Sequence, residues 1–200
     1  MKALVTGASG FIGSTLVEDL GKAGIEVFAL LRKTSDVSNL RDARFTRVEG
    51  DLSSAESLKR AVEGMDYVFH LAGATMAPSR EAFFRHNAEG TRLLAEAVAA
   101  VNPGLKRFVH VSSLAAAGPA TAVESPRAEH EPSRPVSDYG ASKLQGEVEI
   151  LKHKDRFPIA IVRPPMVYGT RDKGVYVVIK TVAGRLAPVM KGATPDGAKY

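Results

Sequence analysis

Tyr139 and Lys143 have the residue types and the spacing of an acid–base pair. Four residues are about one turn of an α-helix, so a helix here would project both side chains from one face. A free tyrosine has a pKa of about 10 and is a poor base at neutral pH. A nearby ammonium favours the phenolate and brings the phenol closer to useful proton transfer. The alternative is an exposed pair of helix side chains without chemistry.

Two serines, Ser112 and Ser113, follow the apolar run from Arg107 to Val111. A strand that ends in hydroxyl residues places hydrogen-bonding groups at the carboxyl-terminal edge of its sheet. In open α/β sheets this edge is where ligands bind. We therefore expect a polar site after this strand.

A glycine-rich segment follows the first apolar run and precedes an amphipathic stretch. Its spacing is GxxGxxG rather than the dehydrogenase fingerprint GxGxxG. Glycine permits a tight turn and a close approach of backbone N–H groups to a pyrophosphate, and the next helix adds partial positive charge. The bland alternative is a simple turn. We predict a dinucleotide-binding loop made of Thr6, Gly7, Ser9, Gly10, Phe11, Ile12 and Gly13.

The end of the second apolar run predicts the form of the dinucleotide. An NAD site places Asp or Glu near this point to hold the ribose 2′-hydroxyl, whereas this chain has Leu31 followed by Arg32 and Lys33. A guanidinium suits a 2′-phosphate through charge-assisted hydrogen bonds. We predict NADP(H) in preference to NAD(H), with Arg32 as the main ligand; the alternative is an ordinary exposed arginine.

Alternating strands and helices must position these residues. The apolar runs predicted as strands are 3–5, 27–31, 68–72, 108–111 and 159–162. They are nearly continuously apolar, as expected of parallel strands covered on both faces. The predicted helices are 13–23, 55–62 after a cap at Ser53 or Ser54, 89–101, and one opening at Tyr139. The pattern predicts an α/β fold with a doubly wound parallel sheet of the Rossmann type.

The sequence also predicts one buried helix face and one long loop. The helix that opens at Tyr139 has apolar positions at Leu144, Val148 and Leu151, which predict its buried face. The segment from Leu114 to Asp138 contains four prolines and no periodic pattern, so we predict a structureless loop at the ligand-binding edge.

Composition excludes several classes of protein. The chain has 200 residues, of which 44% are apolar, which suffices for one core. Its net charge of +5 comes from cations scattered among acidic residues, so solvated helix faces are favoured over a nucleic-acid site. It has no cysteine and no apolar run long enough to cross a membrane. The N-terminus reads as a strand rather than a secretory signal, so we expect a cytoplasmic location.

We predict no metal site, because the histidines lack zinc-ligand spacing. They stand at 70, 86, 110, 130 and 153. His70 and His110 lie in strand patterns and are expected to be packed groups.

Taken together, the motifs resemble the extended short-chain dehydrogenases/reductases over essentially the whole chain. In chain order they are the loop 6–13, Asp51-Leu52, His70-Leu71-Ala72-Gly73, Asn87-Ala88-Glu89-Gly90-Thr91, the Val-Ser-Ser strand end, Tyr139xxxLys143, and Arg163-Pro164 with the run to Gly169. Only the glycine spacing departs from the common dehydrogenase fingerprint.

The resemblance implies a role for each matching residue. Tyr139 would be the general acid/base and Lys143 would also hold the nicotinamide ribose. Ser113, in preference to Ser112, would hydrogen-bond the reacting oxygen, and Asn87 would support the active-site helix or a water relay. The further cofactor-binding residues implied are Asp51, Leu52, Leu71, Ala72, Gly73, Val111, Pro164 and Val167.

The residues after Ser113 indicate a branch of this superfamily. Similar dehydratases have Thr-Asp-Glu where this chain has Ser113-Leu114-Ala115, and sugar epimerases have Val-Tyr-Gly where it has Ala116-Ala117-Gly118. The run is more similar to 3β-hydroxysteroid dehydrogenases and dihydroflavonol reductases. We expect an enzyme, an NADP(H)-dependent oxidoreductase that interconverts a carbonyl and a secondary alcohol. The alternatives are a nucleotide-sugar epimerase and, in another class, a non-catalytic NADP(H) sensor or scaffold.

The domain organisation is also an expectation from the resemblance. Residues 1–163 would form the NAD(P)-binding domain and 164–200 the beginning of a C-terminal substrate domain, mostly absent here, reached through a glycine-rich hairpin near 189–192. Exposed apolar residues at 177–179 would then favour association. The expected partners are a small carbonyl or alcohol substrate and a second copy of the chain, bound through helices 87–101 and 139–151, with no nucleic acid and no membrane.

Overall fold

The computed structural model describes residues 1–120, 122 and 125–184. Within these residues, one parallel sheet runs in the order β3-β2-β1-β4-β5-β6. Its strands are β1 (Lys2–Thr6), β2 (Glu26–Leu31), β3 (Thr46–Glu49), β4 (Tyr67–His70), β5 (Arg107–Val111) and β6 (Ile159–Val162). The strand order reverses direction between β1 and β4, and this point is where doubly wound sheets open a crevice for ligands.

Helices connect the strands on both sides of the sheet. They are α1 (Phe11–Lys22), α2 (Ala55–Val62), α3 (Arg80–Phe84), α4 (Gly90–Val101), α5 (Leu114–Ala117), α6 (Asp138–Leu151) and α7 (Gly174–Ala183). A 3-10 turn, η1 (Ser38–Leu40), follows β2, and a wide π-helical turn, η2 (Arg85–Glu89), joins α3 to α4. Single π turns inside helices occur often at functional sites.

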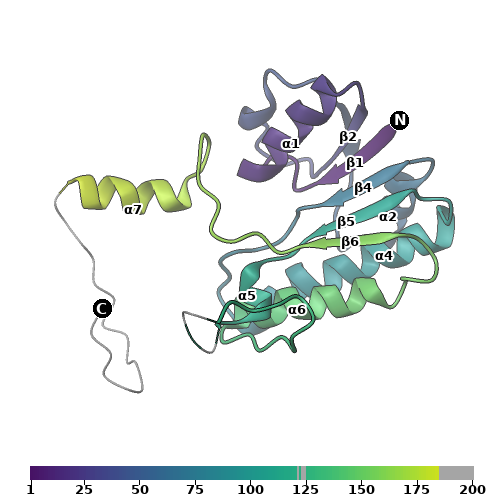
Figure 1. Ribbon diagram of the computed structural model, residues 1–200. Coiled ribbons are helices and arrows are strands. Elements are labelled where there is room, and N and C mark those ends of the chain that lie inside the picture. The colour runs from purple at the N-terminus through teal and green to yellow at the C-terminus, as the bar shows by residue number, and fades with distance from the viewer. Residues whose placement is uncertain (121, 123–124, 185–200) are drawn as a thin grey trace. The chain divides into compact units, whose positions relative to one another are not determined.

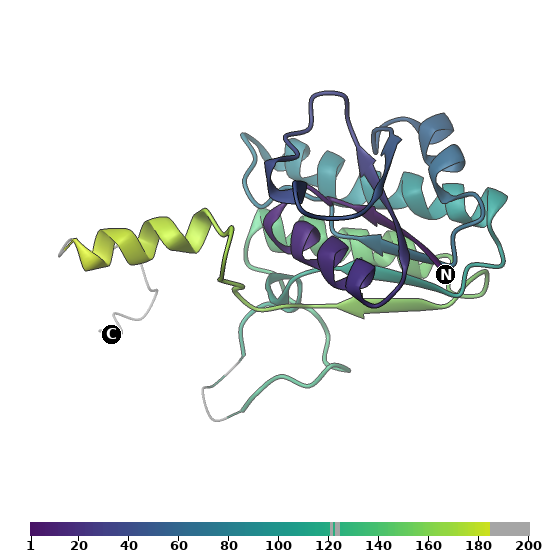
Figure 2. The same cartoon turned by 90° about the horizontal axis from the view of Figure 1, so that it is seen from above.

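The sheet separates two hydrophobic cores. Helix α1 covers one face, whereas α2, α4 and α6 lie on the other (Figures 1 and 2). On the α1 side Val5 packs with Val17, and on the opposite side Leu4 packs with Leu94 and Phe108; all five side chains have no exposed surface. Alternate residues of β1 therefore anchor both layers, as expected for a central parallel strand.

The predicted α/β sheet and its helices are confirmed, with three corrections. The first concerns β6: it lies at the sheet edge, its residues are only partly buried, and Val162 is 47% exposed rather than covered on both faces. The second concerns the predicted loop, because residues Leu114–Ala117 form the short helix α5, capped by Ser113. Four alanine-rich residues are too few to give a periodic signal.

The third correction concerns the buried face of α6. Val148 and Leu151 are each 45% exposed, whereas Lys143 and Glu147 are almost fully buried. Polar side chains of α6 thus face the interior of the protein. The apolar pattern instead marks a partly exposed surface.

The chain divides into two compact units, the first spanning Met1–Met166 and the second beginning at Val167, of which residues 167–184 are described. The first contains the sheet and ends three residues after the predicted boundary. In the second, helix α7 has no buried residue, and Val177, Val178 and Ile179 are more than half exposed, in keeping with the exposed apolar surface expected here. The predicted hairpin near 189–192 lies outside the described residues.

None of the helices in the described part of the chain has the length and hydropathy needed to span a bilayer.

Candidate active site

The glycine-rich loop has the backbone geometry of a close-approach site. Gly7 has φ of 70°, and a side chain there would place its Cβ 2.6 Å from the backbone nitrogen of Ala72. A Cβ at Gly13 would lie 2.1 Å from the carbonyl oxygen of Gly7, so α1 starts directly against the loop. The amide of Gly10 donates to the same oxygen at 3.0 Å, which closes the turn. These glycines leave the backbone and the start of α1 open to an anionic ligand.

A pocket of about 860 Å³ opens beside this loop. It lies at the carboxyl-terminal ends of the strands, around the point where the strand order reverses. Eight of the predicted cofactor-binding residues line it: Thr6, Gly7, Ser9, Arg32, Asp51, Leu52, Ala72 and Gly73. The volume is within the usual range of ligand sites, so a dinucleotide fits the residues present.

The other predicted cofactor residues lie elsewhere. Gly10, Phe11, Ile12 and Gly13 form the loop's entry into α1, and Leu71 follows β4. The carbonyl of Val111 accepts from Lys143, and the carbonyl of Pro164 accepts from the amide of Leu114 at 3.0 Å. Val167 begins the second compact unit, which is described by itself.

The pocket also contains residues that sequence reasoning missed. They are Ala8, Leu30, Leu31, Ser35, Gly50, Ser53, Ala74, Arg85, His86, Glu89, Gly90 and Leu93. Arg85 and His86 belong to η2, where a π turn changes which side chains face the sheet. Because a helical repeat assigns faces by regular spacing, no periodic signal in the sequence marks this change. The sequence did contain a signal for Ser35 as a pocket residue, because it stands three residues after the predicted ligand Arg32, close enough for a turn to bring the two together.

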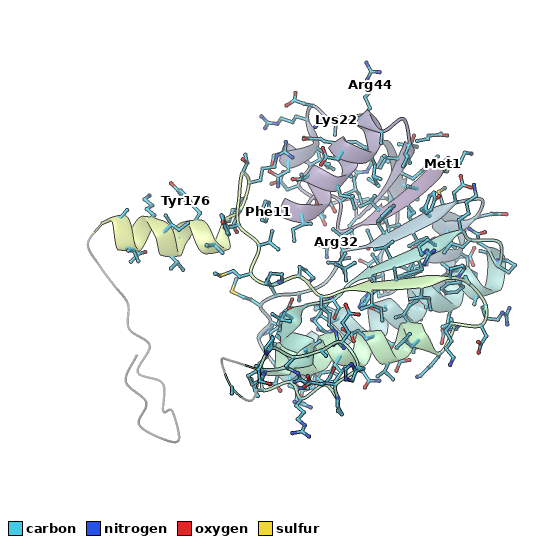
Figure 3. All side chains as sticks on the ribbon, viewed as in Figure 1. Met1, Phe11, Lys22, Arg32, Arg44 and Tyr176 are labelled. Carbon is cyan, nitrogen blue, oxygen red and sulfur yellow. The ribbon has the colours of Figure 1, made fainter. Side chains whose placement is uncertain are left out.

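Arg32 is held in the pocket wall through its backbone. Its amide donates to Ser35 Oγ at 3.0 Å, and its carbonyl accepts from the guanidinium of Arg47 at 2.7 Å. Figure 3 shows Arg32 and Phe11 at the end of the sheet opposite Met1. The neighbouring Lys33 turns to Glu49, 3.5 Å away. Arg32 therefore lines the pocket on a main chain that is held by two hydrogen bonds.

Asp51 is an acidic residue of this pocket. Its Oδ1 accepts from the amide of Ser53 at 2.8 Å and from Ser53 Oγ at 2.7 Å. These hydrogen bonds, with a smaller contribution from the charge of Arg32, hold the pKa of the Asp51 carboxyl below its ordinary value. Asp51 is thus an anion that turns toward its own loop.

Lys143 lies buried beneath the strand ends. Its Nζ donates to the carbonyl oxygen of Val111 at 2.8 Å, and only 4% of the residue is exposed. Burial lowers its pKa to about 8, against a smaller opposing effect from the carboxylate of Glu147. A lysine with this pKa is still mostly an ammonium at neutral pH.

Tyr139 and Ser113 are brought together by the packing of α5 against α6. A Cβ at Gly140 would lie 2.3 Å from the carbonyl oxygen of Ala115, so the two helix starts touch through their backbones. Ser113 caps α5 by accepting from the amide of Ala115 at 3.2 Å, and Ser137 caps α6. The ring of Tyr139 packs 6.0 Å from that of Phe83. The structure therefore places the two predicted catalytic residues at adjacent helix starts.

Asn87 connects α6 to the turn after β4. Its Oδ1 accepts from the amide of Ala74 at 2.7 Å, while its Nδ2 donates to Ser142 Oγ at 2.9 Å. Ser142 in turn donates to the carbonyl of Tyr139 at 2.7 Å. Asn87 has no exposed surface, so it supports the helix of Tyr139 from below.

A buried hydrogen-bond chain reaches Asn87 from the glycine loop. Thr91 Oγ1 donates to the Asn87 carbonyl at 2.7 Å, so it must accept from Nε2 of His70, 2.9 Å away. Nδ1 of His70 then accepts from Thr6 Oγ1 at 2.7 Å. Burial, followed by the charge of Lys143, lowers the pKa of His70 to about 3, so this histidine is neutral.

His110 is buried beside His70, with 5.3 Å between ring centroids, and its nitrogens have no hydrogen-bond partner among the described residues. Both histidines are packed groups, as predicted. The described residues contain no group of three or more side chains able to hold a metal ion.

Ser112 has a different environment from its neighbour Ser113. It is 4% exposed and donates to the carboxylate of Glu147. Arg163 binds the same carboxylate with two hydrogen bonds, from Nε at 2.9 Å and from Nη2 at 2.5 Å. Ser112 is therefore committed to an internal contact, which leaves Ser113 as the more accessible hydroxyl.

The fold and the site together define a dinucleotide-dependent class of protein. Their shared features are the parallel sheet, the glycine loop, the crevice at the strand reversal, and the Ser, Tyr and Lys residues at one edge of the sheet. Comparison with known proteins identifies the class: residues 3–192 match the family model described as "NAD dependent epimerase/dehydratase family". The chain belongs to this family.

The relatives it matches differ in their named activities. The chain is 37% identical to ceramide reductase of Caulobacter vibrioides, over 84% of this chain and 47% of that protein. It is 32% identical to sterol demethylase protein B of Methylococcus capsulatus, over 96% of this chain and 61% of that protein. It thus spans about half to three fifths of the length of these relatives.

Among solved structures, the chain is similar to MoeE5 in complex with UDP-glucose and NAD. The TM-score is 0.78 and the identity 30%, over 92% of this chain and 60% of MoeE5.

Proposed function

We propose that the protein is an NADP(H)-dependent oxidoreductase that interconverts a carbonyl and a secondary alcohol of a small molecule. The observation that carries this proposal is Arg32, which lines the pocket directly after Leu31, the residue in the place where an NAD site has an acidic side chain. A guanidinium there favours a 2′-phosphate. NADP(H) supplies the hydride when it is bound.

The chain's own residues orient the substrate and move the proton. Tyr139 donates its phenolic proton to the carbonyl oxygen in the direction of reduction and accepts it back in oxidation. Ser113 donates a hydrogen bond to the same oxygen and fixes its position. Lys143, held by the Val111 carbonyl, supplies a positive charge one helical turn from Tyr139 on the same face of α6. Asn87 and Ser142 hold the helix that carries both residues.

Net redox chemistry is favoured over epimerisation by the residues after Ser113. They form α5 and its end, where Ala116-Ala117-Gly118 stand in place of the Val-Tyr-Gly of similar sugar epimerases. Leu114 and Ala115 likewise stand in place of the acidic pair that an elimination would require. The relative named ceramide reductase supports a reductase.

A nucleotide-sugar epimerase is the second candidate. The likeness to MoeE5, solved with UDP-glucose and NAD, favours it. An epimerase returns its hydride to the substrate, so its cofactor undergoes no net change.

Calorimetry with NADPH and NADH, at fixed salt, tests the cofactor. We expect tighter binding of NADPH, and a selective loss of NADPH affinity in Arg32→Asp because a carboxylate repels the 2′-phosphate. Arg44→Asp is the matched control, since Arg44 is exposed and outside the pocket residues. Equal affinities for both dinucleotides, or unchanged NADPH affinity in Arg32→Asp, would contradict the assignment.

Turnover tests the reaction. Acetophenone and androstenedione serve as carbonyl probes, followed by loss of NADPH absorbance, and UDP-glucose serves as the epimerase probe. We expect reduction of a carbonyl probe by the parent and none by Tyr139→Phe, which should still bind NADPH. Interconversion of UDP-glucose without net NADPH loss supports the epimerase. NADPH binding without turnover of any probe supports a non-catalytic sensor or scaffold.

The setting of this reaction is also a proposal. We propose a cytoplasmic enzyme with a small-molecule substrate, acting as a homodimer and binding neither nucleic acid nor membrane. Residues 164–200 would begin its substrate-binding part. The absence of cysteine and the scattered cations support this view.

A further inference from the structure

Glu147 is a buried carboxylate on the active-site helix. It is 3% exposed and accepts hydrogen bonds from Ser112 and twice from Arg163. A buried ion pair adds little to stability compared with apolar residues of similar volume, but it fixes direction and distance. Its presence inside α6, where a leucine would serve the core, therefore calls for a role in geometry.

The spacing along α6 relates Glu147 to the catalytic pair. Tyr139, Lys143 and Glu147 follow one another at intervals of four residues and form one stripe along the helix. Lys143 donates to the carbonyl of Val111, and Glu147 accepts from Ser112, the next residue of the chain. Two successive turns of α6 are thus bonded to two successive residues at the end of β5. The next residue after these is Ser113.

Arg163 extends the same contact to a third segment. It follows β6, and besides its two bonds to Glu147 it donates from Nη2 to Ser133 Oγ at 3.0 Å. The guanidinium neutralises the carboxylate and keeps both oxygens in a fixed plane. The ends of β5 and β6, helix α6 and the loop before it therefore meet at one carboxylate.

We propose that Glu147 is a positioning residue that, through Ser112 and Arg163, sets the separation between the Ser113 hydroxyl and the Tyr139 phenol. The proposal rests on the function proposed above, in which these two groups bind the same substrate oxygen. Glu147 touches neither substrate nor cofactor; it acts by holding β5 and α6 in register. Misplacement of reacting groups by about 1 Å can cost about 100-fold in rate.

Ser112→Ala is the variant that isolates this effect. Glu147→Ala would leave Arg163 without its partner, so a loss of fold would obscure the result. Ser112→Ala removes one hydrogen bond and leaves the Glu147–Arg163 pair in place. Ser54→Ala is the matched control for loss of one side-chain hydrogen bond, because Ser54 caps α2 by accepting from the amide of Ser57 and does not itself line the pocket. Tyr139→Phe is the reference for loss of the proposed chemistry.

The four proteins are compared by kcat and KM for the acetophenone and androstenedione probes, by NADPH affinity and by Tm. We expect Ser112→Ala to lower kcat by about tenfold or more while its NADPH affinity stays at the parent value, since a shift of about 1 Å is costly to chemistry and not to cofactor binding. Ser54→Ala should lose Tm and keep kcat.

Each other outcome is decisive. An unchanged kcat in Ser112→Ala, with Tyr139→Phe inactive, overturns the positioning role and leaves the proposed function standing. Parallel losses of kcat and NADPH affinity show a general effect on the fold and overturn it too. A parent that reduces neither probe, or a fully active Tyr139→Phe, removes the proposed function and the positioning role together.

Discussion

At the scale of single residues, Lys143 carries a charge in surroundings that disfavour it. The ammonium is almost completely buried, with the carbonyl of Val111 as its hydrogen-bond partner, and its pKa is lowered to about 8. The native chain therefore binds fewer protons than the unfolded chain between about pH 8 and 10.5. Stability gains from this residue as pH rises through that window.

Lys143→Met should therefore be more stable than the parent at neutral pH, by up to about 3 kcal/mol, because methionine carries no charge to desolvate. The advantage should shrink as pH rises from about 8 to beyond 10.5, where the parent lysine is neutral in both states. Urea unfolding at several pH values measures it. The exposed Lys154→Met is the control, and a difference that does not vary with pH would contradict the prediction.

The residues of the site were predictable to different degrees. Tyr139, Lys143 and Ser113 could be chosen because their spacing and strand-end position are local properties of the sequence. Arg85 and His86 could not, because a π turn rotates them toward the pocket, and such a turn leaves no periodic trace.

At the scale of elements, the loop between β1 and α1 requires glycine at two positions, Gly7 and Gly13, where a side chain would overlap the neighbouring backbone. A methyl group at Gly13 would lie 2.1 Å from the Gly7 carbonyl oxygen, and neither backbone can move without displacing the other. The start of α1 therefore packs directly against the backbone that lines the pocket.

Gly13→Ala should lower Tm and abolish NADPH binding, because the overlap pushes α1 away from the loop. Thermal unfolding and calorimetry measure the two effects. Gly104→Ala is the control, since a Cβ there meets nothing within 4 Å. Normal NADPH affinity in Gly13→Ala would show that the close approach is not needed.

Five of the six strands and most helices were predictable, because buried parallel strands form continuous apolar runs and amphipathic helices have a periodic pattern. The edge strand β3 was not predicted, because its residues are mostly polar and exposed. The predicted boundaries of β2 and α2 differ from the observed ones by one residue at most. The buried face of α6 was not predictable in this way. Gly146 lets α6 approach η2, with its Cβ position 2.6 Å from the Asn87 carbonyl, while Lys143 and Glu147 are buried through specific partners. Such pairing depends on segments distant in sequence, which periodicity does not detect.

At the scale of the whole molecule, each of the two compact units exposes apolar side chains among its described residues. On α6, Val148 and Leu151 are each 45% exposed, and on α7, Val177 and Ile179 are more than half exposed. Exposed apolar surface of this kind marks association sites. The first belongs to a helix that the resemblance in the sequence predicts as a dimer contact.

We expect the double variant Val148→Asp/Leu151→Asp to be monomeric where the parent is a dimer, since two buried carboxylates would be unpaired at the interface. Light scattering coupled to size-exclusion chromatography measures the mass. Ile179→Asp is the control on the other surface. Dissociation by Ile179→Asp alone would assign the dimer contact to α7, and a monomeric parent would contradict the expectation.

The buried chain through His70 imposes a single order on its hydrogens. The Ala72 amide donates to Thr6 Oγ1 at one end and the Asn87 carbonyl accepts at the other, so both hydroxyl groups and the imidazole must all point the same way. Because an amide N–H only donates and a carbonyl only accepts, this order cannot be reversed. All of these hydrogen bonds therefore run in one direction, from the turn after β4 to the carbonyl of Asn87 in η2. The N–H of His70 is shielded from solvent, so its proton should exchange slowly with water and give an observable NMR resonance. The exchange rate of this proton would report whether β1, β4 and α4 remain packed together.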